Sequence, residues 1–168
     1  MTFDFHFKSI TSKVSKSLFS LKNAKHILTS SALKYLYYAL IHPHFLYCLP
    51  IISCTSQKNV NLLFKKQKLA IRLITKSKYN AHTQPLFYST GILPLPELIL
   101  QQKLQFMHLF NHSLLPSSID ELFVRNATLY GDLYFVRNLN DFYVPGVRTE
   151  FLRGFPFYSF PTALNFLC

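Results

Sequence analysis

The stretch that decides the fold is SQKNVNLLFKKQKLAIRLITKSK, residues 56–78. On a helical period of 3.6 residues its apolar side chains share one face, which consists of Val60, Leu63, Phe64, Ala70, Ile71 and Ile74. The opposite face carries a stripe of basic side chains, which consists of Lys58, Lys65, Lys68, Arg72 and Lys76. Thr55 and Ser56 offer side-chain oxygens that can cap a helix N-terminus. The pattern predicts a helix over residues 56–78 that packs on one side and meets an anionic partner on the other.

The positive charge is concentrated in the first part of the chain. The formal net charge is +11, and residues 5–96 contain thirteen Lys and Arg but no Asp or Glu. No acidic residue is therefore available in the stripe for an ion pair one helical turn away. The positive electrostatic field of such a segment favours nucleic acid or an anionic membrane surface as the partner, although basic surfaces also increase solubility.

Composition bounds the class of protein. Hydrophobic residues make up 49% and charged residues only 15% of 168 residues, which indicates a packed domain rather than a disordered chain. The three cysteines, Cys48, Cys54 and Cys168, are odd in number and not closely paired, which is typical of a reducing compartment. No secretory signal pattern opens the chain, so we expect an intracellular protein, nuclear or cytoplasmic.

Helical periodicity recurs outside the central stretch. Apolar spacing predicts helices over residues 3–21 and 29–41, a new helix at His42-Pro43, a helix from Glu97 to about 111 and a last turn at 116–122. Before the helix from Glu97, residues 85–88 form a short apolar piece that Gly91 is expected to close. In the helix from Glu97, Leu98 is expected on the exposed face and Leu100 on the buried one. We expect a mainly α fold, a bundle of about five to six helices.

The last part of the chain differs in character. Residues 123–168 are rich in Phe and Tyr, interleaved with Arg, and are interrupted by Pro and Gly. They are expected to form short strands or irregular chain packed on the helices. The predicted domains are a helical domain, 1–122, and an aromatic-rich C-terminal segment, 123–168.

A membrane role is the main alternative partner class. The uncharged window at residues 35–57 is long enough to span a bilayer. His42, Pro43, His44 and Pro50 interrupt the window, which two buried helices explain better. A basic membrane-associated or protein-interaction protein that uses the apolar 35–54 stretch remains an alternative.

Residue patterns for catalysis are missing from the sequence. The acidic residues form no Asp-Asp pair for two-metal chemistry, the four glycines stand alone, and there is no G-x-S-x-G elbow. His42, His44, Cys48 and Cys54 match no common zinc spacing, and nothing in the sequence would activate Cys48 as a nucleophile. We therefore expect no catalytic residue, no cofactor and no metal.

The order of several motifs resembles a known family. These motifs are KVSK at residues 13–16, LYYALIHPHFLY at 36–47, QKLAIRLI at 67–74, HTQPLF at 82–87, ILPL at 92–95, Arg137-Asn138 and Asn165. Together they resemble the region after the polymerase palm in reverse transcriptases of non-LTR retrotransposons, the LINE type, with the jockey and CR1-like branches closest. The family usually ends in a Trp-Asn pair, whereas Leu164 precedes Asn165 here.

The resemblance implies a non-catalytic thumb and linker fragment of an RNA-directed DNA polymerase. Its partners would be template-primer nucleic acid, bound by its phosphates without sequence preference, and the polymerase palm and fingers that carry the catalytic aspartates. The predicted nucleic-acid-binding residues are Lys58, Lys65, Lys66, Lys68, Arg72, Lys76 and Lys78. A non-functional retroelement remnant is a further alternative.

Overall fold

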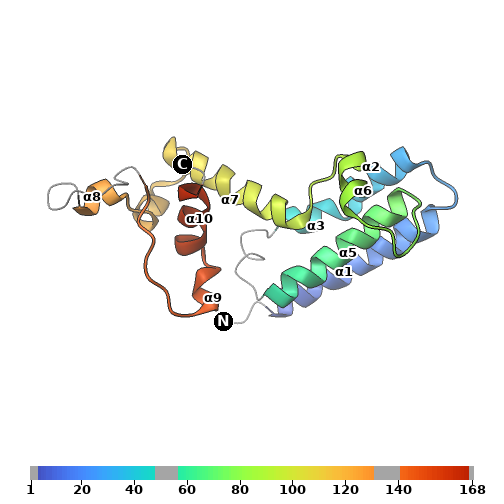
Figure 1. Cartoon of the computed structure of the whole chain (residues 1–168), viewed down its shortest axis with the longest axis horizontal. Coiled ribbons are helices and arrows are strands. Elements are labelled where there is room, and N and C mark those ends of the chain that lie inside the picture. Colours follow the sequence, from blue (N-terminus) through green and yellow to red (C-terminus); the bar gives the residue numbers. More distant parts are fainter. Residues whose placement is uncertain (1–3, 48–56, 131–140, 167–168) are drawn as a thin grey trace. The chain divides into compact units, whose positions relative to one another are not determined.

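The computed structural model describes residues 4–47, 57–130 and 141–166. Its elements in chain order are α1 (Asp4–Ala24), α2 (Ser30–Leu40), α3 (His42–Leu46), α5 (Gln57–Ile74), α6 (Gln84–Thr90), α7 (Leu95–Asn111), the 3-10 helix η1 (Ser117–Leu122), α8 (Asn126–Tyr130), α9 (Glu150–Arg153) and α10 (Pro156–Asn165). The predicted mainly α fold is confirmed (Figure 1).

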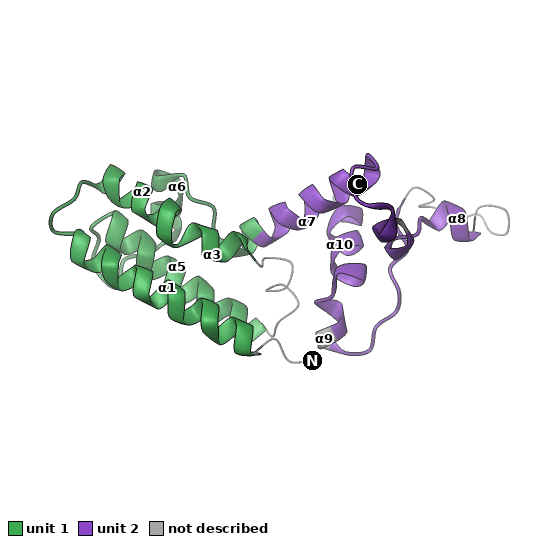
Figure 2. Cartoon of the chain, turned by 180° about the vertical axis from the view of Figure 1, so that it is seen from behind, with its two compact units in different colours: residues 1–98 green, residues 99–168 purple. Residues whose placement is uncertain are grey.

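The chain divides into two compact units, residues 1–98 and 99–168 (Figure 2). The predicted boundary at 122/123 differs from this division, which falls inside α7. The reason is that the second half of α7 supplies part of the core of unit 2, where Phe106, Met107 and Phe110 pack with Phe123.

Unit 1 is built on α1, α2 and α5. Figure 1 shows α1 and α5 side by side and running in the same direction, with α2 antiparallel to them. The predicted apolar face of α5 is confirmed, because Val60, Leu63, Ala70, Ile71 and Ile74 are buried and Phe64 is half-buried. The neighbouring helices α1 and α2 contact α5 and bury Val14, Leu18, Leu21, Leu33 and Tyr37.

The first helix is longer than predicted. It continues past Leu21, the predicted end, to Ala24. Lys22 and Ala24 are good helix formers, and no Pro or Gly interrupts the turn. The Lys25 N–H still donates to the Leu21 carbonyl at 3.1 Å.

The helix α5 is shorter than predicted, ending at Ile74 instead of Lys78. Lys76 has a φ of 53°, in the left-handed region. Its N–H donates to Leu73 O at 3.2 Å and the Ser77 N–H donates to Arg72 O at 3.0 Å. This pair of hydrogen bonds is the Schellman pattern, in which the left-handed residue is normally a glycine. Here that residue is a lysine, so the sequence contains no glycine that would mark the end of the helix.

Gly91 ends α6 as predicted, with a φ of 63°. The chain then reaches α7, which begins at Leu95, two residues before the predicted start at Glu97. The predicted faces of α7 are wrong at Leu98, which is buried, and at Leu100, which is exposed. The early start has a specific cause: buried Gln67 on α5 accepts the otherwise free N–H of Leu95 at 2.7 Å.

Unit 2 has an aromatic core. Met107, Phe123, Phe142 and Phe160 are buried, with Phe106, Phe110, Ile119 and Leu164 packed against them. Of the two expected alternatives for residues 123–168, short strands or irregular chain, the described part contains irregular chain but no strand, and it holds one isolated antiparallel bridge between Arg125 and Phe142. Much of the rest is helical, in α8, α9 and α10. Pro156 does not prevent α10, because it stands at the start of that helix, where proline is tolerated.

Candidate nucleic-acid interface

A basic groove runs between α1 and α5. It has a volume of about 500 Å³, and its cations are Lys22 from the last turn of α1, Lys25 just after that helix, and Lys66 and Arg72 from α5. Its floor and walls are completed by Ser15, Leu18, Phe19, Leu69, Leu73, Ser77 and Tyr79. No carboxylate lines it.

A second hollow lies on the outer surface of α5. It measures about 390 Å³ and is lined by Leu62, Lys65, Lys66, Lys68, Leu69, Arg72 and Tyr79. Lys66, Leu69, Arg72 and Tyr79 line both the hollow and the groove. The two therefore form one continuous surface with six cations, which we call the basic surface and define by Lys22, Lys25, Lys65, Lys66, Lys68 and Arg72.

Three of these cations are held in place by neighbours. Lys66 Nζ donates to Ser15 Oγ of α1 at 2.6 Å. Arg72 Nε donates to the Ala81 carbonyl at 3.0 Å. Lys68 Nζ stands 4.2 Å from the centroid of the Phe64 ring. Each contact fixes a stem or head group without neutralising its charge, so the positive field is retained.

The field is not balanced by acidic side chains. Residues 5–96 contain no Asp or Glu. Within the part of the chain that the structure describes, none of the six cations forms an ion pair with a carboxylate. In a shallow groove with apolar walls, such cations attract anions more strongly than isolated surface lysines do.

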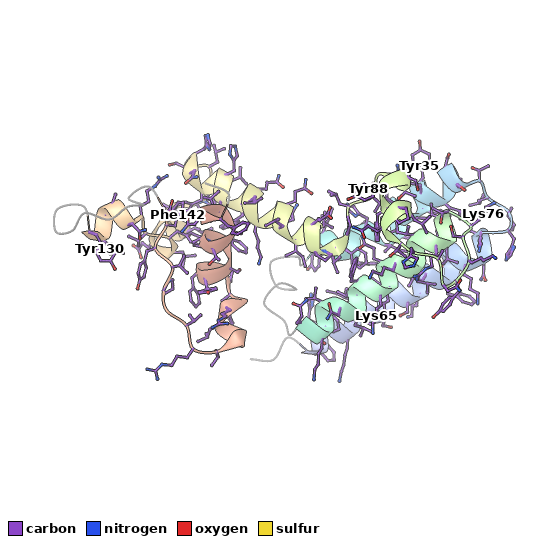
Figure 3. The ribbon with its side chains drawn as sticks, in the orientation of Figure 1. Tyr35, Lys65, Lys76, Tyr88, Tyr130 and Phe142 are labelled. Atoms are coloured by element: carbon purple, nitrogen blue, oxygen red, sulfur yellow. The ribbon has the colours of Figure 1, made fainter. Side chains whose placement is uncertain are left out.

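The predicted site residues divide into two groups. Lys65, Lys66, Lys68 and Arg72 come together on the basic surface. Lys58, Lys76 and Lys78 are exposed but line neither hollow. Figure 3 shows Lys65 near the middle of α5 and Lys76 beyond its end.

Sequence reasoning missed Lys22, Lys25 and Tyr79. The two lysines belong to the groove because α1 continues past Leu21, and extending its period from buried Leu18 by four and seven residues would have found them. Tyr79, 83% exposed, is brought beside Arg72 by the turn at Lys76, which no sequence signal marked.

Two polar residues of the resemblance motifs have structural roles. Gln67 is buried and bonds to Tyr37, Leu93 and Leu95. Asn165 donates to the Phe142 carbonyl at 2.8 Å and accepts the Phe142 N–H at 3.1 Å. Arg137 and Asn138 lie outside the described residues.

The histidine and cysteine candidates lie partly outside the described residues. Cys48 and Cys54 lie outside the described residues, as does Cys168. His42 packs against the rings of Tyr37 and Tyr38, and burial lowers its pKa. Across residues 4–47, 57–130 and 141–166 there is no group of three or more His, Cys, Asp or Glu placed to hold a metal ion.

The described part of the apolar window, residues 35–47, is divided between α2 and α3. Tyr37, Ile41 and Phe45 of this window belong to the core of unit 1. Among the described helices, none has both the length and the apolar character needed to cross a bilayer.

No protein family model matches the chain, and no curated protein or solved structure is significantly similar to it. The resemblance to retrotransposon reverse transcriptases therefore stays a prediction.

Proposed function

We propose that unit 1 binds the sugar-phosphate backbone of nucleic acid through the basic surface and performs no chemistry of its own. The observation that carries this proposal is the gathering of six cations on one surface without a carboxylate. Phosphates spaced along a strand match a row of cations better than a single small anion does.

The aromatic residues on the surface fit the same partner. Phe19 and Tyr79 are exposed and line the groove beside the cations. Aromatic rings interleaved with Lys and Arg are typical of surfaces that follow a nucleic-acid strand. A purely electrostatic solubility surface has no need of an exposed Phe and Tyr in its groove.

This activity agrees with the one implied by the motif order, a thumb and linker fragment of a LINE-type reverse transcriptase. In that setting the basic surface would hold the template-primer duplex for a polymerase palm and fingers. The proposal for backbone binding rests on the surface itself and does not depend on the family.

The test compares two double variants in and just after α1. Lys22→Ala/Lys25→Ala removes two cations of the groove, and Lys13→Ala/Lys16→Ala removes two exposed lysines of α1 that line neither hollow. Duplex affinity is measured across salt concentrations for both. The groove variant is expected to flatten the log-log salt slope by about 1.8, at about 0.9 per phosphate contact. Equal slopes in the two variants would contradict the proposal.

A second variant tests the part of the surface on α5. Lys65→Ala/Lys68→Ala/Arg72→Ala is expected to flatten the slope by about 2.7. An unchanged slope would remove α5 from the interface.

A further inference from the structure

A third hollow in unit 1 adjoins the basic surface. It measures about 600 Å³ and is lined by Phe64, Lys68, His82, Thr83, Gln84, Phe87, Tyr88, Gly91, Ile92, Leu93, Pro94, Pro96 and Glu97. Lys68 lines this hollow as well as the outer surface of α5. A strand whose phosphate meets Lys68 would therefore have the hollow within reach of the attached nucleoside.

The walls of the hollow are aromatic and apolar. The rings of Phe64 and Phe87 are stacked, with centroids 6.2 Å apart, and form a rigid wall beneath Lys68. Tyr88, labelled in Figure 3, lies on α6, lines the hollow and is 79% exposed. Exposed aromatic faces of this kind are platforms on which bases stack.

Polar groups line the same hollow. The Thr83 side chain does not cap α6, and its hydroxyl has no hydrogen-bond partner among the described residues. Gln84 and Glu97 are exposed there and offer an amide and a carboxylate. These groups can donate hydrogen bonds to the edge of a nucleobase or accept hydrogen bonds from it.

The charges of Glu97 and Lys68 favour different positions for the base and the phosphate of a nucleotide. Glu97 is the one carboxylate in the lining, and it disfavours a phosphate inside the hollow. Lys68, at the border, favours a phosphate just outside it. An uncharged, flat, hydrogen-bonding ring fits the interior, and the volume lies within the range of small-molecule sites.

We propose that this hollow binds one unstacked nucleobase of a strand whose backbone lies on the basic surface. The inference rests on the proposed function and adds to it a preference for single-stranded or frayed nucleic acid. The base stacks on Tyr88, while its phosphate contacts Lys68.

The test uses the full 168-residue chain and three probes of equal length: a thymidine strand with one 2-aminopurine, the same backbone with abasic residues, and a duplex. The wild type is expected to bind the base-bearing strand about 5-fold to 150-fold more tightly than the abasic strand. Its binding should also quench the 2-aminopurine fluorescence.

The decisive variant is Tyr88→Ala, with Tyr35→Ala as the matched control. Tyr35 is also exposed, lies on α2 and lines none of the three hollows. Tyr88→Ala should weaken the preference for bases and the quenching but keep the duplex affinity and its salt slope. Tyr35→Ala should behave like the wild type.

The outcomes separate the two proposals. Equal affinity for base-bearing and abasic strands, with salt-dependent duplex binding intact, would overturn the nucleobase hollow alone. So would a base preference that Tyr88→Ala leaves unchanged. A wild-type protein that binds none of the three probes would overturn the proposed function, and the hollow with it.

Discussion

Gln67 Nε2 donates a hydrogen bond to Tyr37 Oη across 3.0 Å, with both side chains fully buried in unit 1. The same Nε2 donates to the Leu93 carbonyl at 2.9 Å, and Oε1 accepts the Leu95 N–H. One side chain of α5 is thus hydrogen-bonded both to α2 and to the segment that leads into α7. Burial raises the pKa of Tyr37 far above its usual value, which keeps the hydroxyl protonated and part of this network.

We predict that Gln67→Leu destabilises the protein by at least about 2 kcal/mol. The substitution nearly preserves volume but leaves the buried Tyr37 hydroxyl and the buried Leu95 N–H without partners, each costing about 1 to 3 kcal/mol. Chemical denaturation followed by circular dichroism measures the change. Gln57→Ala, at an exposed glutamine of the same helix, is the control and should stay within about 0.5 kcal/mol of the wild type. Similar losses in both variants would contradict the network's role.

We predict that His42 makes the fold weaker in mild acid. Its folded-state pKa is lowered from 6.5 by burial, so the unfolded chain binds the proton more readily. The free energy of unfolding therefore falls as pH drops below about 6.5, down to the folded pKa. His42→Phe keeps a ring beside Tyr37 and Tyr38 and should flatten this dependence. His26→Gln, at an exposed histidine, should leave it unchanged; the reverse pattern would rule out His42 as the cause.

We predict that Lys76→Gly stabilises unit 1 by about 1 kcal/mol. The φ of 53° strains a residue with a Cβ atom, and glycine adopts this conformation freely. Lys78→Gly removes the same charge two residues later, where φ is not positive, and should not stabilise. Thermal unfolding of both variants measures the difference. If both shift the midpoint alike, charge rather than backbone strain is responsible.

We predict that Asn165→Leu loosens unit 2 by about 2 kcal/mol. The Asn165 amide satisfies both backbone groups of Phe142, much as a partner strand would, and leucine can satisfy neither. Hydrogen exchange should accelerate in peptides that cover residues 141–147 and stay unchanged in α1 and α5. Gln101→Ala, exposed on α7, is the control. No change at 141–147 would show that the two hydrogen bonds contribute little.

The sequence predicted the helices whose signals are local. The apolar period of α5 and Gly91 after α6 each act within one or two turns, and both predictions were confirmed. The Thr29 side chain accepts the Ala32 N–H at 3.3 Å, as a helix cap should. These features depend on neighbours in the chain and are visible in a sequence.

The errors arose where distant residues decide the outcome. Gln67 and Leu95 are far apart in sequence, and their bond sets the start of α7. The Phe cluster of unit 2 stabilises α10 despite Pro161 within it. Lysine at a left-handed position carries no sequence signal, so the end of α5 and the placement of Tyr79 were missed.

The candidate site was also predicted only where its signals are local. Of the α5 cations that were predicted from its period, Lys65, Lys68 and Arg72 share a surface, and Lys66 joins them. The groove itself needs α1 beside α5, a pairing that no local pattern specifies. Lys22 and Lys25 could be assigned to it only once the two helices were seen side by side (Figure 1).

The salt dependence of duplex binding by the wild-type chain tests the central claim most directly. If the six cations of the basic surface each neutralise one phosphate, the slope of log K against log salt is about −5. A slope no steeper than about −1, or no binding to a duplex at low salt, would contradict the account.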